Sequence, residues 1–428
     1  MEIASVKSSA STAAPTSTYK TALIVVTTLF FMWGFVTVLN DVLVPHLKSI
    51  FDLNYAKVML IQFSFFSAYF LFSIPSAKLI DWVGYKRTMV IGVMIMGVGA
   101  LLFIPAASVP SYPLFLGALM VLAGGITALQ VAANPYVAVL GPAETASSRL
   151  NLSQAFNSLG TAIAPYLGGW LILSASPKSM DVVRQMSADA LQAYRVQEAS
   201  SVKFPYFVIG LALILLGVVI AMFKLPPLPE AERRGKNVTG DSVWKHRHLV
   251  LGAIGIFVYV GAEVSIGSFL INYFSQPNIG NISELVAARY VSYYWSGAMV
   301  GRFIGSAILQ KLRTGKVLGI AAAMASLLVC ISMLTFGHVA MWSIILVGFF
   351  NSVMFPSIFT LGIAKLGPLT GDGSGLLIMA IVGGAIIPVA QGALADQIGI
   401  HHAFILPAVC YLYIVYYAFK GSRIAATP

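Results

Sequence analysis

Three ionisable residues interrupt long apolar stretches of this chain, where a charge is costly. Asp41, Glu263 and Arg302 each stand inside a run of mostly hydrophobic residues. A charged side chain at the centre of a lipid bilayer costs at least ~2.5–3.5 kcal/mol, so it usually faces a polar cavity or an opposite charge. Burial favours the uncharged form of a carboxyl group, whereas a nearby cation favours the charged form. We therefore predict that Asp41 carries a proton; the alternative is a structural hydrogen bond.

The roles of the other two ionisable residues stay open at this point. Glu263 could bind hydroxyl groups of a ligand, share the proton with Asp41, or coordinate sodium. Arg302 could pair with either acid, could belong to a gate, or could extend its charge toward the membrane surface.

Carboxamide side chains are the second kind of polar residue in the apolar stretches. Each amide both donates and accepts hydrogen bonds, which suits a ligand rich in hydroxyl groups. One or two such amides commonly hold helices together, but their number here indicates a polar cavity. Aromatic rings could add flat stacking surfaces, and the cluster at residues 293–295 is the first to consider. The predicted ligand contacts are Asn40, Gln130, Asn134, Gln154, Asn157, Glu263, Asn272, Tyr294, Trp295, Asn351 and Gln391.

The composition requires lipid as the solvent for most of the chain. Of its 428 residues, 58% are hydrophobic and only 10% are charged, against about 45–50% and about 25% in soluble domains. The net charge of +11 is spread between apolar runs, as the positive-inside rule requires, and does not form a nucleic-acid footprint. Cys330 and Cys410 lie within apolar segments, so we expect no disulfide, metal site or cofactor.

Spans of about 20 apolar residues cross a bilayer as helices. The sequence predicts an all-α membrane protein with twelve transmembrane helices in two six-helix bundles, at residues 21–224 and 249–421. Residues 1–20 are expected to be disordered, residues 225–248 to form a cytoplasmic linker, and residues 422–428 to form a tail. Most Lys and Arg residues fall in connections that are cytoplasmic if both termini are cytoplasmic, which favours that orientation in a bacterial inner membrane. The polar stretch 175–203 predicts a short surface helix.

An internal repeat supports two related halves. The segment Gly160–Pro165 (GTAIAP) resembles Gly383–Pro388 (GGAIIP), and the glycine and leucine that follow each segment also match. Parallel six-helix repeats are typical of transporters that bind a substrate near the bilayer midplane between the halves.

Residues 77–87 (AKLIDWVGYKR) resemble the loop signature of the major facilitator superfamily, with Ala77 in place of the usual first glycine. In that family the loop takes part in gating at the cytoplasmic side. The resemblance implies that role for Asp81, Gly84, Lys86 and Arg87, and we add Arg302 as a possible gate residue.

Further stretches resemble the L-fucose–proton symporter family, in its glucose, galactose and N-acetylglucosamine branch. They are Asn40–Asp41, residues 132–136 (AANPY), residues 149–160 (RLNLSQAFNSLG), residues 258–270 and residues 301–305 (GRFIG). The resemblance implies a monomeric proton-coupled symporter that imports a small neutral hexose or N-acetylhexosamine. Asp41 matches an acid of the fucose symporter, but its second acid corresponds to Gln130, so the two-acid mechanism does not carry over completely.

Other functions remain to be weighed. A sodium-coupled or uncoupled sugar carrier is the main alternative. The sequence has no HExxH, GxSxG or P-loop pattern to support a membrane enzyme. The pair His401–His402 is expected to be solvated in an outer loop rather than to bind metal.

Overall fold

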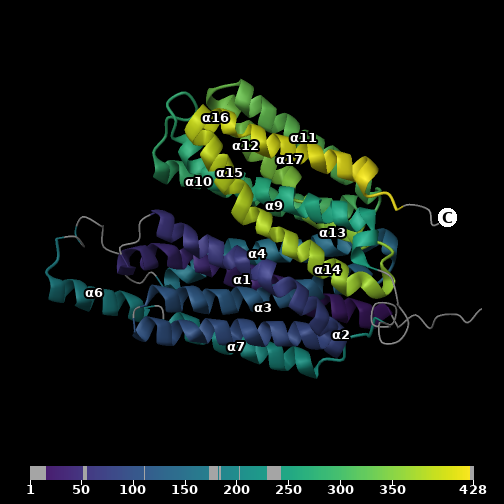
Figure 1. The fold of residues 1–428 in the computed structure, drawn as a ribbon, viewed down its shortest axis with the longest axis horizontal. Helices are drawn as coiled ribbons and strands as arrows, with labels where there is room; N and C mark the ends of the chain where they lie inside the picture. Colours follow the sequence, from purple (N-terminus) through teal and green to yellow (C-terminus); the bar gives the residue numbers. More distant parts are fainter. Residues whose placement is uncertain are drawn as a thin grey trace, which may run out of the picture.

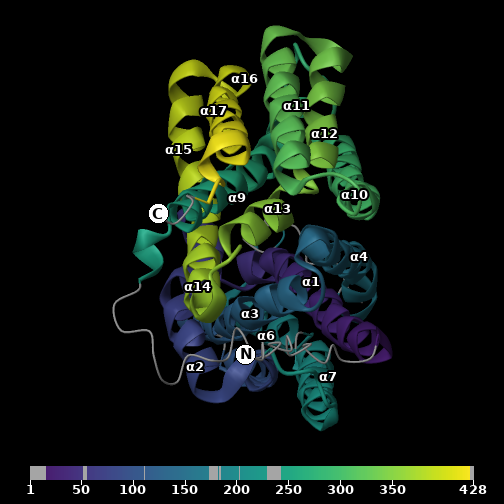
Figure 2. The same ribbon diagram turned by 90° about the vertical axis from the view of Figure 1, so that its right-hand side faces the viewer.

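The computed structural model describes residues 16–51, 55–109, 111–172, 182, 185–201, 203–228 and 242–424. Within these ranges the chain forms helices and no β-strand, arranged as two bundles that lie side by side (Figures 1 and 2). The first helix begins and the last one ends at the same end of the molecule, on the right of Figure 1. We call this the terminal end, and the opposite one the distal end.

In the N-terminal bundle, α2 consists of two helices joined at a kink. It covers the second and third predicted spans, which join at Gly84, where φ is 82° and ψ is 167°. A side chain rarely adopts this backbone conformation, and glycine does so freely. The bundle consists of α1 (Thr16–Phe51), α2 (Tyr55–Ser108), α3 (Tyr112–Val139), α4 (Ala146–Ile172) and α7 (Lys203–Met222). The predicted surface helix is confirmed as α6 (Ala188–Ser201).

The C-terminal bundle has several spans made of two or three helical pieces. Such interruptions are tolerated at membrane depth where the backbone is enclosed by protein. The single helices are α9 (Arg247–Phe274), α10 (Glu284–Ile308) and α11 (Thr314–Leu334). The interrupted spans are α12 (Gly337–Asn351) with α13 (Met354–Gly362), α14 (Thr370–Met379) with α15 (Gly383–Ile398), and α16 (Ile400–Ala403) with α17 (Ile405–Tyr416) and η6 (Tyr417–Gly421).

The predicted fold class is confirmed. Nine stretches of the described residues are long and apolar enough to cross a membrane. One of them is the double span of α2, and the more polar α4 and α10 complete the set of twelve.

The expected disordered N-terminus, the linker and the tail can be compared with the structure only in part. Because α1 begins at Thr16, residues 16–20 are helical and not disordered as expected; a helix can continue beyond the last apolar residue of its span. Residues 1–15, 229–241 and 425–428 lie outside the described part, so most of the expected linker and tail is not characterised.

The repeat glycines occupy equivalent contacts in the two bundles. A Cβ on Gly160 of α4 would overlap the backbone oxygen of Phe31 in α1, and one on Gly383 of α15 would overlap the backbone oxygen of Phe257 in α9. In each bundle the repeated glycine therefore allows two helix backbones to touch, as small residues do at membrane helix interfaces. This equivalence is what a duplicated ancestral bundle would produce.

The expectation of a solvated histidine pair is wrong for His401. Its side chain is buried, its Nδ1 lies 3.1 Å from the Tyr273 hydroxyl, and its ring stacks on Phe336. The short helix α16, to which His401 belongs, thus lies against Tyr273 and Phe336. His402 is exposed, as expected.

The backbone contact at Gly383 should be sensitive to a single methyl group. We expect Gly383→Ala to lower the apparent Tm in detergent by a few degrees, because overpacking typically costs about 1–3 kcal/mol. The control is Gly117→Ala in α3, where a Cβ would meet no atom within 4 Å. Equal melting temperatures for the two variants would contradict the contact.

Candidate functional site

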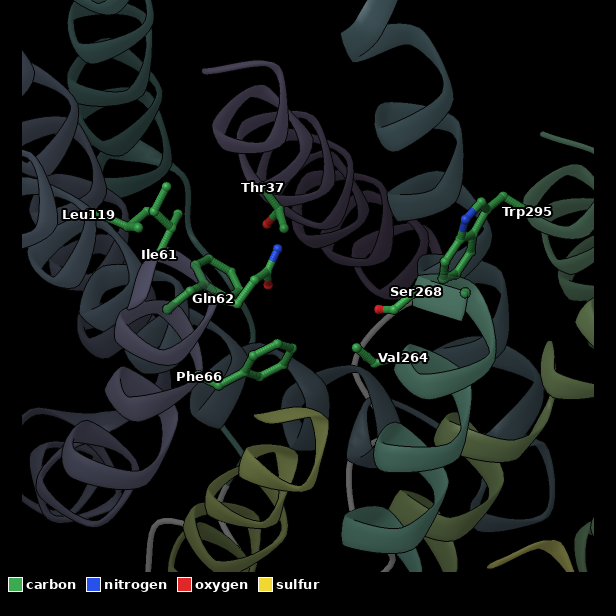
Figure 3. Close-up of a pocket in the computed structure, with 10 residues that line it drawn as sticks. Thr37, Ile61, Gln62, Phe66, Leu119, Val264, Ser268 and Trp295 are labelled. Carbon is green, nitrogen blue, oxygen red and sulfur yellow. The ribbon is translucent and has the colours of Figure 1, made fainter. Parts of the chain in front are cut away.

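A cavity lies between the two bundles, on the distal side of the molecule. Its volume is about 390 Å³, and its walls come from α1, α2 and α3 on one side and from α9 and α10 on the other (Figure 3). Most of the lining is apolar: Ile61, Phe65, Phe66, Leu119, Val264 and Gly267. This mixture of a mostly apolar wall with a few polar groups is typical of small-molecule sites.

Four lining side chains carry groups that can form hydrogen bonds. Thr37 and Gln62 project from the N-terminal bundle, and Ser268 and Trp295 from the C-terminal bundle (Figure 3). The Thr37 hydroxyl donates to the backbone oxygen of Trp33 at 2.8 Å, so it can offer a ligand only its lone pairs. None of the described residues that line the cavity is charged, so these residues recognise a ligand through hydrogen bonds and apolar contacts.

Glu263 and Arg302 form a buried ionisable pair in the C-terminal bundle, and Arg302 also contacts the N-terminal bundle. Arg302 Nη2 lies 3.9 Å from Glu263 Oε1, and both side chains are largely buried. Arg302 Nη1 also donates to the Ser158 hydroxyl of α4, and Asn151 Nδ2 of α4 donates to the backbone oxygen of Arg302 at 2.6 Å. One guanidinium group thus contacts an acid in its own bundle and a hydroxyl in the opposite bundle.

Helix geometry relates this pair to the cavity. Glu263 precedes Gly267 by one turn of α9, which is about 6 Å along the axis, and Arg302 follows Trp295 by about two turns of α10. Because α9 and α10 run in opposite directions, both members of the pair lie on the terminal side of the cavity. The pair therefore lies toward the terminal end from most of the cavity lining, and Glu263 directly precedes the lining residue Val264.

The amides of the N-terminal bundle mainly join helices. Gln130 Nε2 donates to the Tyr69 hydroxyl at 2.7 Å, and Asn157 Nδ2 donates to the backbone oxygen of Phe30 at 2.9 Å. Gln154 Nε2 lies 3.5 Å from Asn134 Oδ1. All four amides are buried and outside the cavity lining, so this state uses them within the bundle.

The C-terminal bundle has its own buried polar cluster. Asn351 Nδ2 donates to the Tyr294 hydroxyl at 2.8 Å, and the Tyr259 hydroxyl donates to the backbone oxygen of Asn351 at 3.1 Å. Asn351 Oδ1 and both polar atoms of the Gln391 amide are buried without a hydrogen-bond partner among the described residues. These atoms keep hydrogen-bonding capacity for another state or for water.

The remaining residues predicted for the site are Trp295, Asn272, Asn40 and Asp41. Trp295 lines the cavity. Asn272 is exposed near the end of α9 and does not line the cavity. Asn40 and Asp41 belong to α1, but their side chains lie outside the described part of the chain.

Comparisons with known proteins agree with this arrangement. The family described as the Major Facilitator Superfamily matches residues 22–380. A glucose/galactose transporter of Brucella abortus (strain 2308) is 54% identical over 405 residues, which cover 95% of each chain. The L-fucose-proton symporter of Escherichia coli (strain K12) is 36% identical over 404 residues, covering 93% of this chain and 92% of the symporter.

This chain belongs to the major facilitator superfamily. The resemblance to the fucose symporter family is confirmed as well. The crystal structure of the major facilitator transporter FucP in the outward conformation superimposes with a TM-score of 0.87 at 35% identity, covering 94% of this chain and 98% of FucP.

The major facilitator loop signature lies beside the second bundle. Asp81 and Arg87 are exposed, and Lys86 Nζ donates to the backbone oxygen of Ala221 at 2.7 Å. Ala77 faces Gly375 of α14, where an added Cβ would come within 2.8 Å of the Ala77 Cβ. The small residue at this crossing is thus supplied by Gly375, which accounts for the alanine where the signature has glycine. The gating roles of these residues stay a prediction.

Hydroxyl groups join the two bundles of this major facilitator protein at the terminal end. Each of these hydrogen bonds connects a residue of α3 or α4 with one of the C-terminal bundle, at donor–acceptor distances between 2.6 and 2.9 Å. The pairs are Ser147 with Thr314 and Thr360, Ser148 with the backbone of Ser306, and Ser374 with the backbone of Val131. Uncharged bonds of this kind are each worth about 0.5–1.5 kcal/mol, so the closed end can reopen.

Sequence reasoning missed Thr37, Gln62 and Ser268 as cavity residues. Thr and Ser are common structural residues in membrane helices, so their type alone gave no signal. Spacing gave a signal only for Thr37, which lies one turn before Asp41, whereas Ser268 lies five residues after Glu263 and so on a different face of the helix. For Gln62, at the start of the second span, we find no comparable signal.

A cysteine pair should cross-link the closed end. The Ser148 and Ser306 hydroxyl oxygens are 3.3 Å apart, so Ser148→Cys with Ser306→Cys brings two sulfur atoms within reach of a disulfide. With a protease site placed in residues 229–241, we expect the cleaved halves to comigrate after oxidation and to separate after reduction. Each single variant controls for bonds through Cys330 and Cys410. Separation of the oxidised halves of the double variant would contradict the interface.

Proposed function

We propose that the protein is a proton-coupled symporter that imports a small neutral hexose or N-acetylhexosamine by alternating access. The single observation that carries the proposal is a cavity between two bundles whose described lining carries no charge, with a buried acid and arginine on its terminal side. The relatives named as sugar transporters and as a fucose-proton symporter support the same substrate class and the same coupling ion.

The terminal end is proposed to face the cytoplasm. The distribution of Lys and Arg supports this orientation, in the inner membrane of a bacterium. The cavity then faces the outside and the hydroxyl contacts close the inside, which is the outward-facing state of an importer. The resemblance in structure to FucP in the outward conformation agrees with it.

The ion pair offers a physical route for coupling. A proton on Glu263 removes the negative charge beside Arg302, while Arg302 still contacts Ser158 of the other bundle. The contact with Ser158 must change when the terminal end opens. The charge of Glu263 is therefore linked to an interface between the bundles, as protonation switches require.

The same pair favours a proton over sodium at Glu263. A sodium ion at the carboxylate would lie close to the guanidinium charge of Arg302, and like charges at about 4 Å repel strongly in a low-dielectric interior. A proton neutralises the acid without adding a second charge. Sodium coupling through other residues is distinguished by the transport assay below.

Transport by purified protein in proteoliposomes tests the proposal. With an inward proton gradient and no sodium, we expect uptake of at least one of D-glucose, D-galactose, N-acetylglucosamine and L-fucose above the equilibrium level. An uncoupler should abolish the accumulation. Accumulation that requires sodium and survives the uncoupler would favour the sodium-coupled alternative, and uptake that never exceeds equilibrium would favour an uncoupled carrier.

Removing the charge of Glu263 should separate exchange from accumulation. We expect Glu263→Gln to retain sugar counterflow within about threefold of wild type, because exchange needs no net proton movement. Proton-driven accumulation should fall to an internal-to-external ratio near one. The matched control is Glu284→Gln, an exposed acid at the start of α10, which should accumulate sugar normally. Wild-type accumulation by Glu263→Gln would remove this residue from the coupling mechanism.

Asp41 is proposed as the carrier of the coupled proton. We expect Asp41→Asn to keep counterflow and to lose uphill accumulation in the same assay. Unchanged accumulation would end this assignment. Loss of counterflow together with an altered apparent Tm would instead assign Asp41 the structural role considered above.

A further inference from the structure

The geometry points to a specific monosaccharide subsite, in which Gln62 and Ser268 bind the sugar hydroxyls from opposite bundles while Trp295 supports the ring. This inference rests on the proposed function and assigns the contacts of that site. It differs from the sequence prediction, which placed most contacts on buried amides.

The Gln62 amide and the Ser268 hydroxyl are available for a ligand. Both point into the cavity from opposite walls (Figure 3), and both side chains are exposed. Neither side chain makes a hydrogen bond to another described residue, whereas the amides at positions 130, 154 and 157 are engaged within their bundle. A carboxamide and a hydroxyl together both donate and accept, which matches neighbouring hydroxyl groups on a sugar.

Trp295 is held in place as an aromatic wall. A Cβ on Gly267 would come within 2.9 Å of the Trp295 Cζ2 atom, so the absent side chain lets the indole lie against α9. Tyr294 meets the indole edge-on, with ring centroids 5.0 Å apart and planes at 84°. The Trp295 side chain remains 44% exposed at the cavity, where its indole can cover the apolar face of a pyranose. Phe66 lines the opposite wall.

The size and charge of the cavity narrow the ligand class. A volume of about 390 Å³ is at the low end of the range of about 300–1,000 Å³ for small-molecule sites, which favours one sugar ring over two. Among the described residues, the lining offers neither a cation for a sugar phosphate nor an acid for an amino sugar. A neutral monosaccharide fits all of these properties.

The position of the contacts also explains how sugar could promote closure. One hydrogen-bonding group belongs to α2 and the other to α9, so a bound sugar connects the two bundles at the distal end. Any shortening of these bonds draws the bundles together there. Binding energy from a neutral ligand can thus favour the state in which the distal end is closed.

Half-saturation concentrations for counterflow test the subsite. We expect Gln62→Ala and Ser268→Ala each to raise the half-saturation concentration for the best-transported hexose about 3–10-fold, as loss of one hydrogen bond predicts. Trp295→Leu should raise it about 10-fold or more, and Trp295→Phe should restore most of the affinity. The apparent Tm of each variant should stay at the wild-type value, and maltose should not compete.

Matched controls and a protection assay complete the test. Trp342→Leu replaces a tryptophan of similar exposure, 45%, away from the cavity, and Gln276→Ala replaces a glutamine in the turn after α9; neither should change half-saturation. Alkylation of a Gln62→Cys variant by an impermeant maleimide should slow with hexose and not with maltose, above the background from Cys330 and Cys410. Wild-type half-saturation in the three cavity variants, or alkylation unaffected by hexose, would overturn the subsite. Absence of hexose counterflow in the wild-type protein would overturn the proposed function itself.

Discussion

The arrangement of the two bundles depends most on the contacts of the Arg302 guanidinium group. A cation inside a membrane protein needs polar partners, and this one finds them in both bundles: the Glu263 carboxylate of α9 and the Ser158 hydroxyl of α4. Loss of either partner would leave a buried charge poorly compensated, which costs more than the loss of a neutral contact. The pair therefore constrains how the bundles can move relative to one another.

Close backbone packing stiffens each bundle, so the contacts of Arg302 constrain the bundles as whole units. The contacts of Gly160 with Phe31 and of Gly383 with Phe257 bring helix backbones together in equivalent places of the two bundles. The interface between the bundles is different in kind, because at the terminal end it combines the packing of Gly375 against Ala77 with single hydroxyl bonds. Strong contacts within each bundle and weak contacts between them favour rocking of two rigid units, the motion expected for alternating access.

The fold could be predicted from sequence because lipid imposes length, polarity and charge on every span. The twelve helices and the surface helix α6 followed from those patterns, and the family followed from motifs that resemble it. The site was harder, since a residue within a span can point into the cavity, into its own bundle or toward lipid. Asn157 and Gln130 are as polar as Gln62, yet they bond to Phe30 and Tyr69. Only the rotation of each helix decides which amide reaches a ligand, and sequence periodicity does not fix that rotation in helices buried on several sides.

The relative position of the cavity and the charged pair has a mechanistic consequence. No described residue of the cavity lining is an acid, so a neutral sugar that binds Ser268 and Trp295 need not displace a proton from Glu263. The sugar and the proton on Glu263 can then communicate through the positions of α9 and α10. These helices carry both sets of groups: Ser268 and Glu263 on α9, Trp295 and Arg302 on α10. A shift of either helix toward a bound sugar therefore also displaces the ion pair and its contact with Ser158. Coupling by this route requires only that α9 and α10 move as rigid bodies. The close contacts at Gly383 and Gly267, which hold these helices against their neighbours, are compatible with such motion.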